Sequence, residues 1–372
     1  MTDGAGRVLT DPRLLVDDGR QIQGADVYPH VMRRIGWVYP LYVLMAWAAC
    51  ASVGVAQPLP TTIPIPDGEA GIGFDDLRFS PALGRLLVPA GRTGAIVLVE
   101  PGPWRITRIG GFSARGDYGG GHDDGVTSAD EGRGFVFATD RTALRLVVVD
   151  PANGRVVSSA KLAGGPDYVR YVERTGEVWV TQPDKERIEI FRLEGNPPRP
   201  VHDAFLDVAG GPESLVIDNT RGRAYTHLWK GKTVALNVKN RGMLATWPNG
   251  CDGSRGIALD EERNFLFVGC AEGKGVSLDA KSGRILGKVE TGDGIDLVDY
   301  SPGRGHLYLA AGKSGTLGIA EVTATGGLAL RAEIPTAKGA HCVAADASGN
   351  AYVCDPAAGR ILVVPDAVVP EP

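Results

Sequence analysis

The feature that most constrains this chain is a strand–turn–strand unit that recurs seven times. In each unit a Gly- or Pro-rich turn leads into a short apolar strand, and the residue that opens the strand is almost always charged. The opening residues are Asp75, Asp124, Asp167, Glu213, Arg255, Asp296 and His341, with gaps of 49, 43, 46, 42, 41 and 45 residues. No helical pattern lies between them. A period of this size is typical of a β-propeller, in which each repeat forms one blade around a central channel.

Each repeat has room for four strands. The segment 74–90 (FDDLRFSPALGRLLVPA) contains an apolar strand, a turn built on Pro and Gly, and a second apolar strand, which is a hairpin pattern. Third strands follow, as in 95–99, and fourth strands come after another turn, as in 155–162. The sequence therefore predicts an all-β fold: a seven-bladed β-propeller with four antiparallel strands per blade.

The last repeat lacks a fourth strand, because only a short Pro- and Val-containing tail follows Val364. The segment Thr61–Pro66 (TTIPIP) precedes the first repeat just as 332–335 precedes the seventh. We expect it to close the last blade as its outermost strand. Pro64 and Pro66 are acceptable there, since an edge strand has one side without ladder hydrogen bonds.

The N-terminus carries a targeting pattern. Arg33 and Arg34 are followed by 22 uncharged residues, 35–56, and small residues precede Gln57. This is typical of a secretory signal peptide, although 22 uncharged residues could also span a bilayer as an uncleaved anchor. The sequence thus divides into an unstructured extension or tail (1–31), a signal peptide or anchor (32–56) and the propeller (57–372). We expect a periplasmic or secreted protein that contacts a membrane only through an uncleaved signal.

Four cysteines form two local pairs within blades. Cys342 and Cys354 flank one hairpin, and Cys251 and Cys270 flank the comparable hairpin of the fifth blade. Four cysteines allow three connectivities, and metal ligation is an alternative to disulfides. The chain has no C-x-x-C spacing, and in an exported protein such pairs are more often disulfides. We therefore expect the two local disulfides.

Composition and motifs exclude several classes of function. The net charge of −5 and the absence of Lys/Arg-rich runs argue against a nucleic-acid partner. The chain contains no G-x-S-x-G, H-E-x-x-H, P-loop or C-x-x-C-H motif. Without a local motif, any functional site must be built from residues that the fold brings together. We also expect the protein to be a monomer.

Two repeats carry a family resemblance. The segments 301–309 (SPGRGHLYL) and 349–355 (GNAYVCD) resemble YVTN-type and NHL-type repeats and, more distantly, the gluconolactonase-like propellers. The resemblance spans about residues 61–366 and implies the propeller fold. Gluconolactonase-like enzymes hold a metal with Glu, Asn and Asp at the inner ends of blades. Here the corresponding positions include no Asn and one Arg, which departs from that pattern.

The opening residues predict a charged ring at one mouth of the channel. Its acids would repel one another unless a hard cation binds, their pKa values rise, or water screens them. Oxygen ligands suit Ca²⁺ or Mg²⁺, and a nearby histidine also allows Zn²⁺. We expect Ca²⁺ first, with His341 or His122 as catalytic proton-transfer groups; the alternative is that these polar residues only bind neighbouring blades and water. The expected metal ligands are Asp75, Asp124, Asp167, Glu213 and Asp296.

Loops between the second and third strands carry a cation in every blade, which predicts a basic rim around the acidic centre. Such a rim would attract an anionic ligand, although Lys and Arg are also common in exposed turns. Trp229 lies in one of these loops and either stacks on a ligand or covers a blade edge. The expected rim residues are Arg255, Arg92, Arg141, Lys185, Trp229, Lys274, Lys313 and Arg360.

Two functional hypotheses follow. The first is an exported propeller that binds a small anionic ligand or a partner protein at the channel face, without catalysis. The second is a divalent-metal-dependent hydrolase of a lactone or ester, in which the metal polarises a carbonyl oxygen or activates water. The sequence favours the first.

Overall fold

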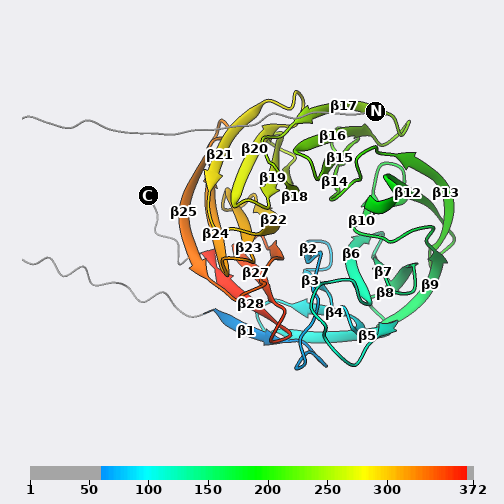
Figure 1. The fold of residues 1–372 in the computed structure, drawn as a ribbon. Helices are drawn as coiled ribbons and strands as arrows, with labels where there is room; N and C mark the ends of the chain where they lie inside the picture. The colour runs from blue at the N-terminus through cyan, green and yellow to red at the C-terminus, as the bar shows by residue number, and fades with distance from the viewer. Residues whose placement is uncertain (1–59, 367–372) are drawn as a thin grey trace, which may run out of the picture. The chain divides into compact units, whose positions relative to one another are not determined.

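The computed structural model describes residues 60–366, which form 28 β-strands and one 3-10 turn, η1 (Pro183–Lys185). The strands make seven four-stranded antiparallel sheets that follow one another around a ring (Figure 1). This confirms the predicted seven-bladed all-β propeller. The extension and signal segment predicted for 1–31 and 32–56 lie outside the described residues. Among residues 60–366, no helix has the length and apolarity needed to cross a bilayer.

The strands of each blade run outward from the channel in chain order. In blades one to three they are β2 (Arg78–Ser80), β3 (Arg85–Pro89), β4 (Thr93–Glu100), β5 (Arg105–Ala114), β6 (Val126–Gly132), β7 (Phe135–Asp140), β8 (Arg145–Asp150), β9 (Arg155–Lys161), β10 (Val169–Val172), β11 (Glu177–Gln182), β12 (Arg187–Glu194) and β13 (Arg199–Asp207).

Blades four to seven repeat the same order, except that the last takes its outer strand from the N-terminal side. Their strands are β14 (Val216–Asp218), β15 (Arg223–Leu228), β16 (Lys232–Asn237), β17 (Met243–Pro248), β18 (Ser254–Asp260), β19 (Phe265–Cys270), β20 (Lys274–Asp279), β21 (Ile285–Glu290), β22 (Ile295–Ser301), β23 (His306–Ala311), β24 (Thr316–Val322), β25 (Leu328–Pro335), β26 (Val343–Ala345), β27 (Asn350–Asp355), β28 (Arg360–Pro365) and β1 (Thr61–Pro64).

The apolar core lies between neighbouring blades. Leu86–Val88 in β3 and Leu146–Val149 in β8 are fully buried, because each middle strand is covered by a blade on either face. A strand buried on both faces is a continuous apolar run rather than an alternating one. The outer strand β9 has one face in water and alternates more. The innermost strands contact each other around the channel, and β26 contacts β2 to complete the ring.

The predicted closure of the seventh blade is confirmed. β1 pairs antiparallel with β28, with Thr61 opposite Val363 and Ile63 opposite Ile361. In Figure 1 the first strand, in blue, lies beside the last, in red. Ile63 is buried against the blade, and the strand ends at Pro64, two residues before the predicted end.

Both predicted cysteine pairs lie at disulfide-bonding distance. The Cα atoms are 5.3 Å apart in Cys251–Cys270 and 5.5 Å apart in Cys342–Cys354. Both separations fall in the usual disulfide range. Each bond stays within one blade. Because the sulfurs are joined to each other, neither pair offers thiolates to a metal.

Candidate functional site at the channel mouth

The opening residues lie where the chain reaches the innermost strand of each blade. The backbone N–H of Asp167 donates to the Thr181 carbonyl, and that of Glu213 to the His227 carbonyl. These bonds fix the opening residue against the second strand of its own blade. Arg255 and Asp296 are the second residues of β18 and β22. The period of the sequence therefore puts side chains from different blades at the same end of the channel.

The first cluster is centred on Asp75, whose side chain is only 5% exposed. His122 Nδ1 lies 3.2 Å from Asp75 Oδ2, and Arg141 Nη1 lies 3.8 Å from it. The Arg141 contact is too long for a hydrogen bond and the His122 contact lacks hydrogen-bond geometry, so these three buried atoms have no hydrogen-bond partner within residues 60–366. Buried polar atoms of this kind gain from any group that completes their bonds.

A glycine-rich loop places His122 in this cluster. A Cβ atom at Gly73 would lie 2.3 Å from the Gly121 carbonyl oxygen and 2.9 Å from His122 Cα. The missing side chain at Gly73 thus lets the 119–121 loop lie directly on the chain that leads to Asp75. Arg141 arrives from the β7–β8 loop, where its backbone N–H donates to the Gly125 carbonyl.

The second cluster is centred on Arg255. Its Nη1 is 2.7 Å from Glu213 Oε1 and 3.9 Å from Asp296 Oδ1. Its guanidinium carbon lies 3.2 Å from the centre of the Trp229 ring, which is a cation–π contact. Trp229 itself is 43% exposed. The arginine thus joins two acids of neighbouring blades and forms a flat, partly exposed surface with the tryptophan.

His341 lies between the clusters. Its Nδ1 is 2.6 Å from the Gly339 carbonyl oxygen, and its Nε2 is 3.0 Å from the Phe74 carbonyl oxygen. The imidazole ring of His341 is thus held between two backbone carbonyl oxygens. The rings of His341 and His122 are 5.5 Å apart.

Charge and burial shift the pKa values at the mouth in opposite directions. Asp75 raises the pKa of His122 to about 10. Burial alone would raise the pKa of Asp75, but His122 and Arg141 bring it below its ordinary value. Burial, with the nearby Asp75, raises the pKa of Asp167 well above its ordinary value. Burial also raises the pKa of Glu213 to about 7, despite the opposing effect of Arg255. The centre therefore binds protons readily, as expected where carboxylates outnumber cations.

The structure does not place all expected metal ligands together. Asp124 faces Arg115, with 3.2 Å between carboxylate oxygen and guanidinium nitrogen, and is 35% exposed. The remaining four acids, Asp75, Asp167, Glu213 and Asp296, are interleaved with Arg141 and Arg255. The predicted ring of mutually repelling acids is therefore wrong: acidic and basic side chains alternate at the mouth. The spacing of the repeats did not reveal that Arg141 turns inward.

Most of the expected basic rim is also arranged differently. Arg92 is buried and donates to four backbone carbonyls, including those of Gly71 and Asp67, so it holds a loop rather than facing solvent. Lys274 pairs with Glu272, and Arg360 pairs with Asp355. Lys185 lies in η1 and does not line the mouth pocket. Of the loop cations, Lys313 does line it.

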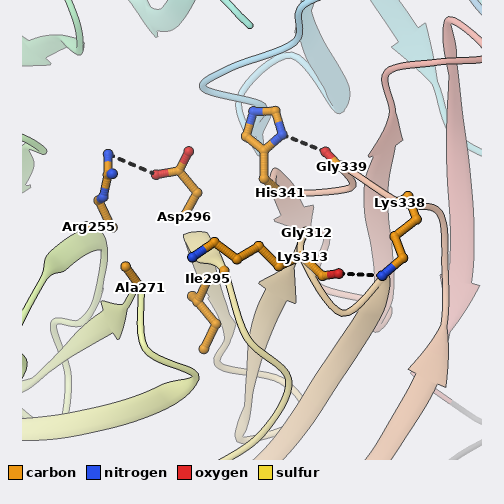
Figure 2. Close-up of a pocket in the computed structure, with 10 residues that line it drawn as sticks. Arg255, Ala271, Ile295, Asp296, Gly312, Lys313, Lys338, Gly339 and His341 are labelled. Atoms are coloured by element: carbon orange, nitrogen blue, oxygen red, sulfur yellow. Dashed lines mark hydrogen bonds and ion pairs between the residues drawn. The ribbon is translucent and has the colours of Figure 1, made fainter. Parts of the chain in front are cut away.

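A pocket of about 460 Å³ opens at the mouth. Figure 2 shows its charged lining: Arg255 and Asp296 face each other, the Lys313 side chain extends across the pocket, and Lys338 points to the Lys313 carbonyl oxygen. Lys313 passes over Gly294: a Cβ atom added at Gly294 would lie 2.5 Å from Cγ of Lys313, so a larger residue there would displace the lysine. Lys338 was not anticipated from the sequence, because it lies in the loop after β25 rather than at the repeated position.

A second polar group crosses the channel between blades one and three. Arg170 donates to both carboxylate oxygens of Asp76, at 2.6 and 2.9 Å, and Ser128 also donates to Asp76. All three residues are buried, and the adjoining cavity holds only about 30 Å³, roughly the volume of one water. This cavity therefore has no room for a ligand larger than water. The sequence signal was a lone arginine in the apolar strand VRYV.

Comparison with known proteins supports the fold alone. No family model and no curated protein sequence matches the chain. Among solved structures, a chain of "Crystal Structure of Mitotic Checkpoint Complex" aligns with a TM-score of 0.68 at 12% identity, covering 89% of this chain and 100% of that one.

Two further structures show the same likeness. The Cps50 (Swd1) β-propeller domain of Myceliophteria thermophila aligns at 0.63 and 13% identity, covering 82% of this chain and 98% of that one. Kuenenia stuttgartiensis hydrazine synthase aligns with a TM-score of 0.65 at 11% identity, covering 83% of this chain and 98% of that one. At these identities the likeness concerns the seven-bladed architecture and carries no function to this chain.

Proposed function

We propose that this chain is an exported binding protein that holds a small organic anion, a carboxylate or a phosphate ester, in the pocket at the channel mouth. The observation that carries the proposal is the lining of that pocket. Arg255, Lys313, Lys338 and His341 surround it, and Asp296 is its one acidic lining residue among residues 60–366. The two disulfides support export, since such bonds persist mainly in oxidising compartments.

The arrangement suits anion capture for two physical reasons. Cations around a concave opening raise the local concentration of an anion and its association rate. The Asp76–Arg170 pair closes the channel to larger groups, so a bound anion stays within reach of the lysines. The attraction of the anion weakens in salt, because the lysines are close to solvent.

The test is calorimetric titration of the full chain with citrate, gluconate and inorganic phosphate at low and high salt. We expect at least one probe to bind at low salt, and Lys313→Gln to weaken it about tenfold, the loss of one charge-assisted hydrogen bond. Lys281→Gln, on an exposed turn of blade five that does not line the pocket, is the matched control. Equal affinities for wild type and Lys313→Gln would contradict the proposal.

A partner protein is the second candidate occupant of this face. The exposed Trp229 ring stacked on Arg255 supports it, because Trp and Arg dominate the energetics of many interfaces. The similar structures include the Cps50 (Swd1) propeller domain and a chain of a mitotic checkpoint complex, which is consistent with such a use of the fold. Trp229→Ala should then abolish capture of a protein while leaving the binding of citrate or phosphate unchanged.

Hydrolysis of a lactone or ester stays a further proposal. It requires a divalent cation, and the interleaved arginines make the acids alone a poor cage for Ca²⁺ or Mg²⁺. The histidines offer a different donor set.

A further inference from the structure

We infer that His122, Asp296 and His341 form a binding site for one divalent first-row transition-metal ion at the inner wall of the mouth pocket. One ligating atom of each residue lies within 4.8 Å of the other two. The residues come from the glycine-rich loop before β6, from β22 and from the segment before β26, so the fold rather than the local sequence assembles them.

The distances are close to those of a bound ion. With bonds of about 2.1 Å, ligand atoms on one ion are separated by about 3.0 Å when adjacent and about 4.2 Å when opposite. From separations of at most 4.8 Å, the three ligand atoms must approach one another by at most about 1.8 Å to become adjacent on one ion. The side chains of His122 and Asp296 are 34% and 25% exposed, and such partly exposed groups can shift by this amount.

Beside Nδ1 of each imidazole lies an oxygen that can serve as the outer partner of a metal-binding histidine. Such a histidine donates its second ring N–H to a carboxylate or backbone carbonyl, which fixes the ring and leaves the other nitrogen for the ion. Nδ1 of His122 faces the buried carboxylate of Asp75 at 3.2 Å. Nδ1 of His341 faces the Gly339 carbonyl oxygen at 2.6 Å. We therefore assign Nε2 of each ring as the ligand atom; in His341 this nitrogen would give up any proton that it shares with the Phe74 carbonyl oxygen.

The Phe74 carbonyl oxygen adds a fourth donor. It lies 3.0 Å from His341 Nε2, which is the separation expected for two adjacent ligands of one ion. The segment 73–75 therefore contributes twice: the Phe74 carbonyl reaches the ion, and the Asp75 carboxylate orients His122. The small Gly73 in front of them allows the close approach of the His122 loop.

The local charge couples metal binding to proton release. Four carboxylates, Asp75, Asp167, Glu213 and Asp296, gather around two guanidinium groups, Arg141 and Arg255. Each imidazole must give up any proton on the nitrogen that binds, so a dication replaces positive charge that this centre already holds.

The donor set identifies the class of ion. Two imidazoles and one carboxylate suit Zn²⁺, Fe²⁺ or Mn²⁺, whereas Ca²⁺ prefers six or more oxygens. This departs from the all-oxygen site expected from the sequence, in which the histidines only moved protons. The inference deepens the proposed function, because open positions on the ion would face the pocket where an anion binds.

The experiment titrates the full chain with Zn²⁺ alone, without any organic anion, so that its outcome does not depend on anion binding. Titration with Co²⁺ and its visible absorption provides an independent readout of the ligand geometry. We expect one Zn²⁺ ion to bind per chain and to raise the melting temperature. Ca²⁺ should not change the melting temperature. His122→Gln and Asp296→Asn should each weaken Zn²⁺ binding at least tenfold while still folding, as checked by circular dichroism.

Two matched pairs separate the site from general effects. His202→Gln, at a half-exposed histidine on β13 beside Glu189, should leave Zn²⁺ affinity unchanged. Gly73→Ala should weaken it by displacing the His122 loop, whereas Gly119→Ala, which meets nothing within 4 Å, should not. Asp75→Asn, a positioning change, should cost ten- to a hundredfold in affinity. Absent Zn²⁺ binding by wild type, or binding that persists in both His122→Gln and Asp296→Asn, would overturn the inference.

Discussion

Single residues at the channel mouth are stabilised by neighbours from other blades. Glu213 depends on Arg255 of the next blade, and Asp75 on His122 and Arg141 of the second blade. Removing one partner of a buried pair leaves an uncompensated charge, which costs far more than the intact pair contributes. The same holds for Asp76 and Arg170 in the channel, so these residues tie together blades that are distant in sequence.

The raised pKa of Glu213, about 7 against an ordinary 4.5, predicts a pH-dependent stability. Because the folded state holds this proton more tightly than the unfolded chain, the free energy of unfolding falls as pH rises from about 4.5 to about 7. The loss is on the order of 3 kcal/mol at most. Glu213→Gln should reduce the difference in melting temperature between pH 5 and pH 8. Glu194→Gln, at an exposed position, should not, and an unchanged difference in Glu213→Gln would contradict the assignment.

Residue identity at the mouth was partly predictable from the sequence. The period placed Asp75, Asp167, Glu213, Asp296 and His341 at one end of the channel, because the same strand position in every blade faces the same way. It could not show which loop cations turn inward, since that depends on side-chain packing across blades. Arg92 and Arg141 occupy equivalent loops, yet one binds backbone carbonyls and the other reaches Asp75.

At the scale of elements, each blade is held by its ladders and, in two blades, by a disulfide. The hairpin β26–β27 has a short inner strand of three residues, and Cys342–Cys354 links its open end. In blade five, Cys251–Cys270 ties the loop before β18 to the end of β19. Both bonds lie beside segments that carry mouth residues, His341 and Arg255. Local spacing predicted them because the two cysteines of each pair flank one hairpin.

The disulfides should appear as two intrablade links in non-reducing peptide mapping. They close segments of 12 and 19 residues, so replacing either pair by serine should lower the free energy of unfolding by up to about 3 kcal/mol in the loop-entropy model. Chemical denaturation of wild type and the Cys342→Ser/Cys354→Ser variant measures this. A link between blades five and seven would show that the pairing is wrong.

The molecule as a whole was the most predictable level. Turn residues at regular spacing and apolar strands between them specify four-stranded blades, and the count of seven follows from the number of repeats. The pocket was not predictable, because its wall combines the entry segments with loops after β23 and β25 whose positions depend on how neighbouring blades pack.

Ring closure by β1 gives the last prediction. Deleting 61–66 removes the outer strand of blade seven, exposes the edge of β28 and leaves the two ends of the ring joined by a few contacts such as the hydrogen bond from the Ile72 N–H to the Pro356 carbonyl. We expect the deletion of 61–66 to lower the melting temperature sharply. Removal of residues 1–31 should leave the melting temperature unchanged. A matched pair of point changes refines the test. Ile63→Ala, at a side chain 1% exposed, should cost about 2–5 kcal/mol, but Thr62→Ala, at its exposed neighbour, should cost under about 0.5 kcal/mol. If the deletion melts like wild type, β1 does not hold the ring closed.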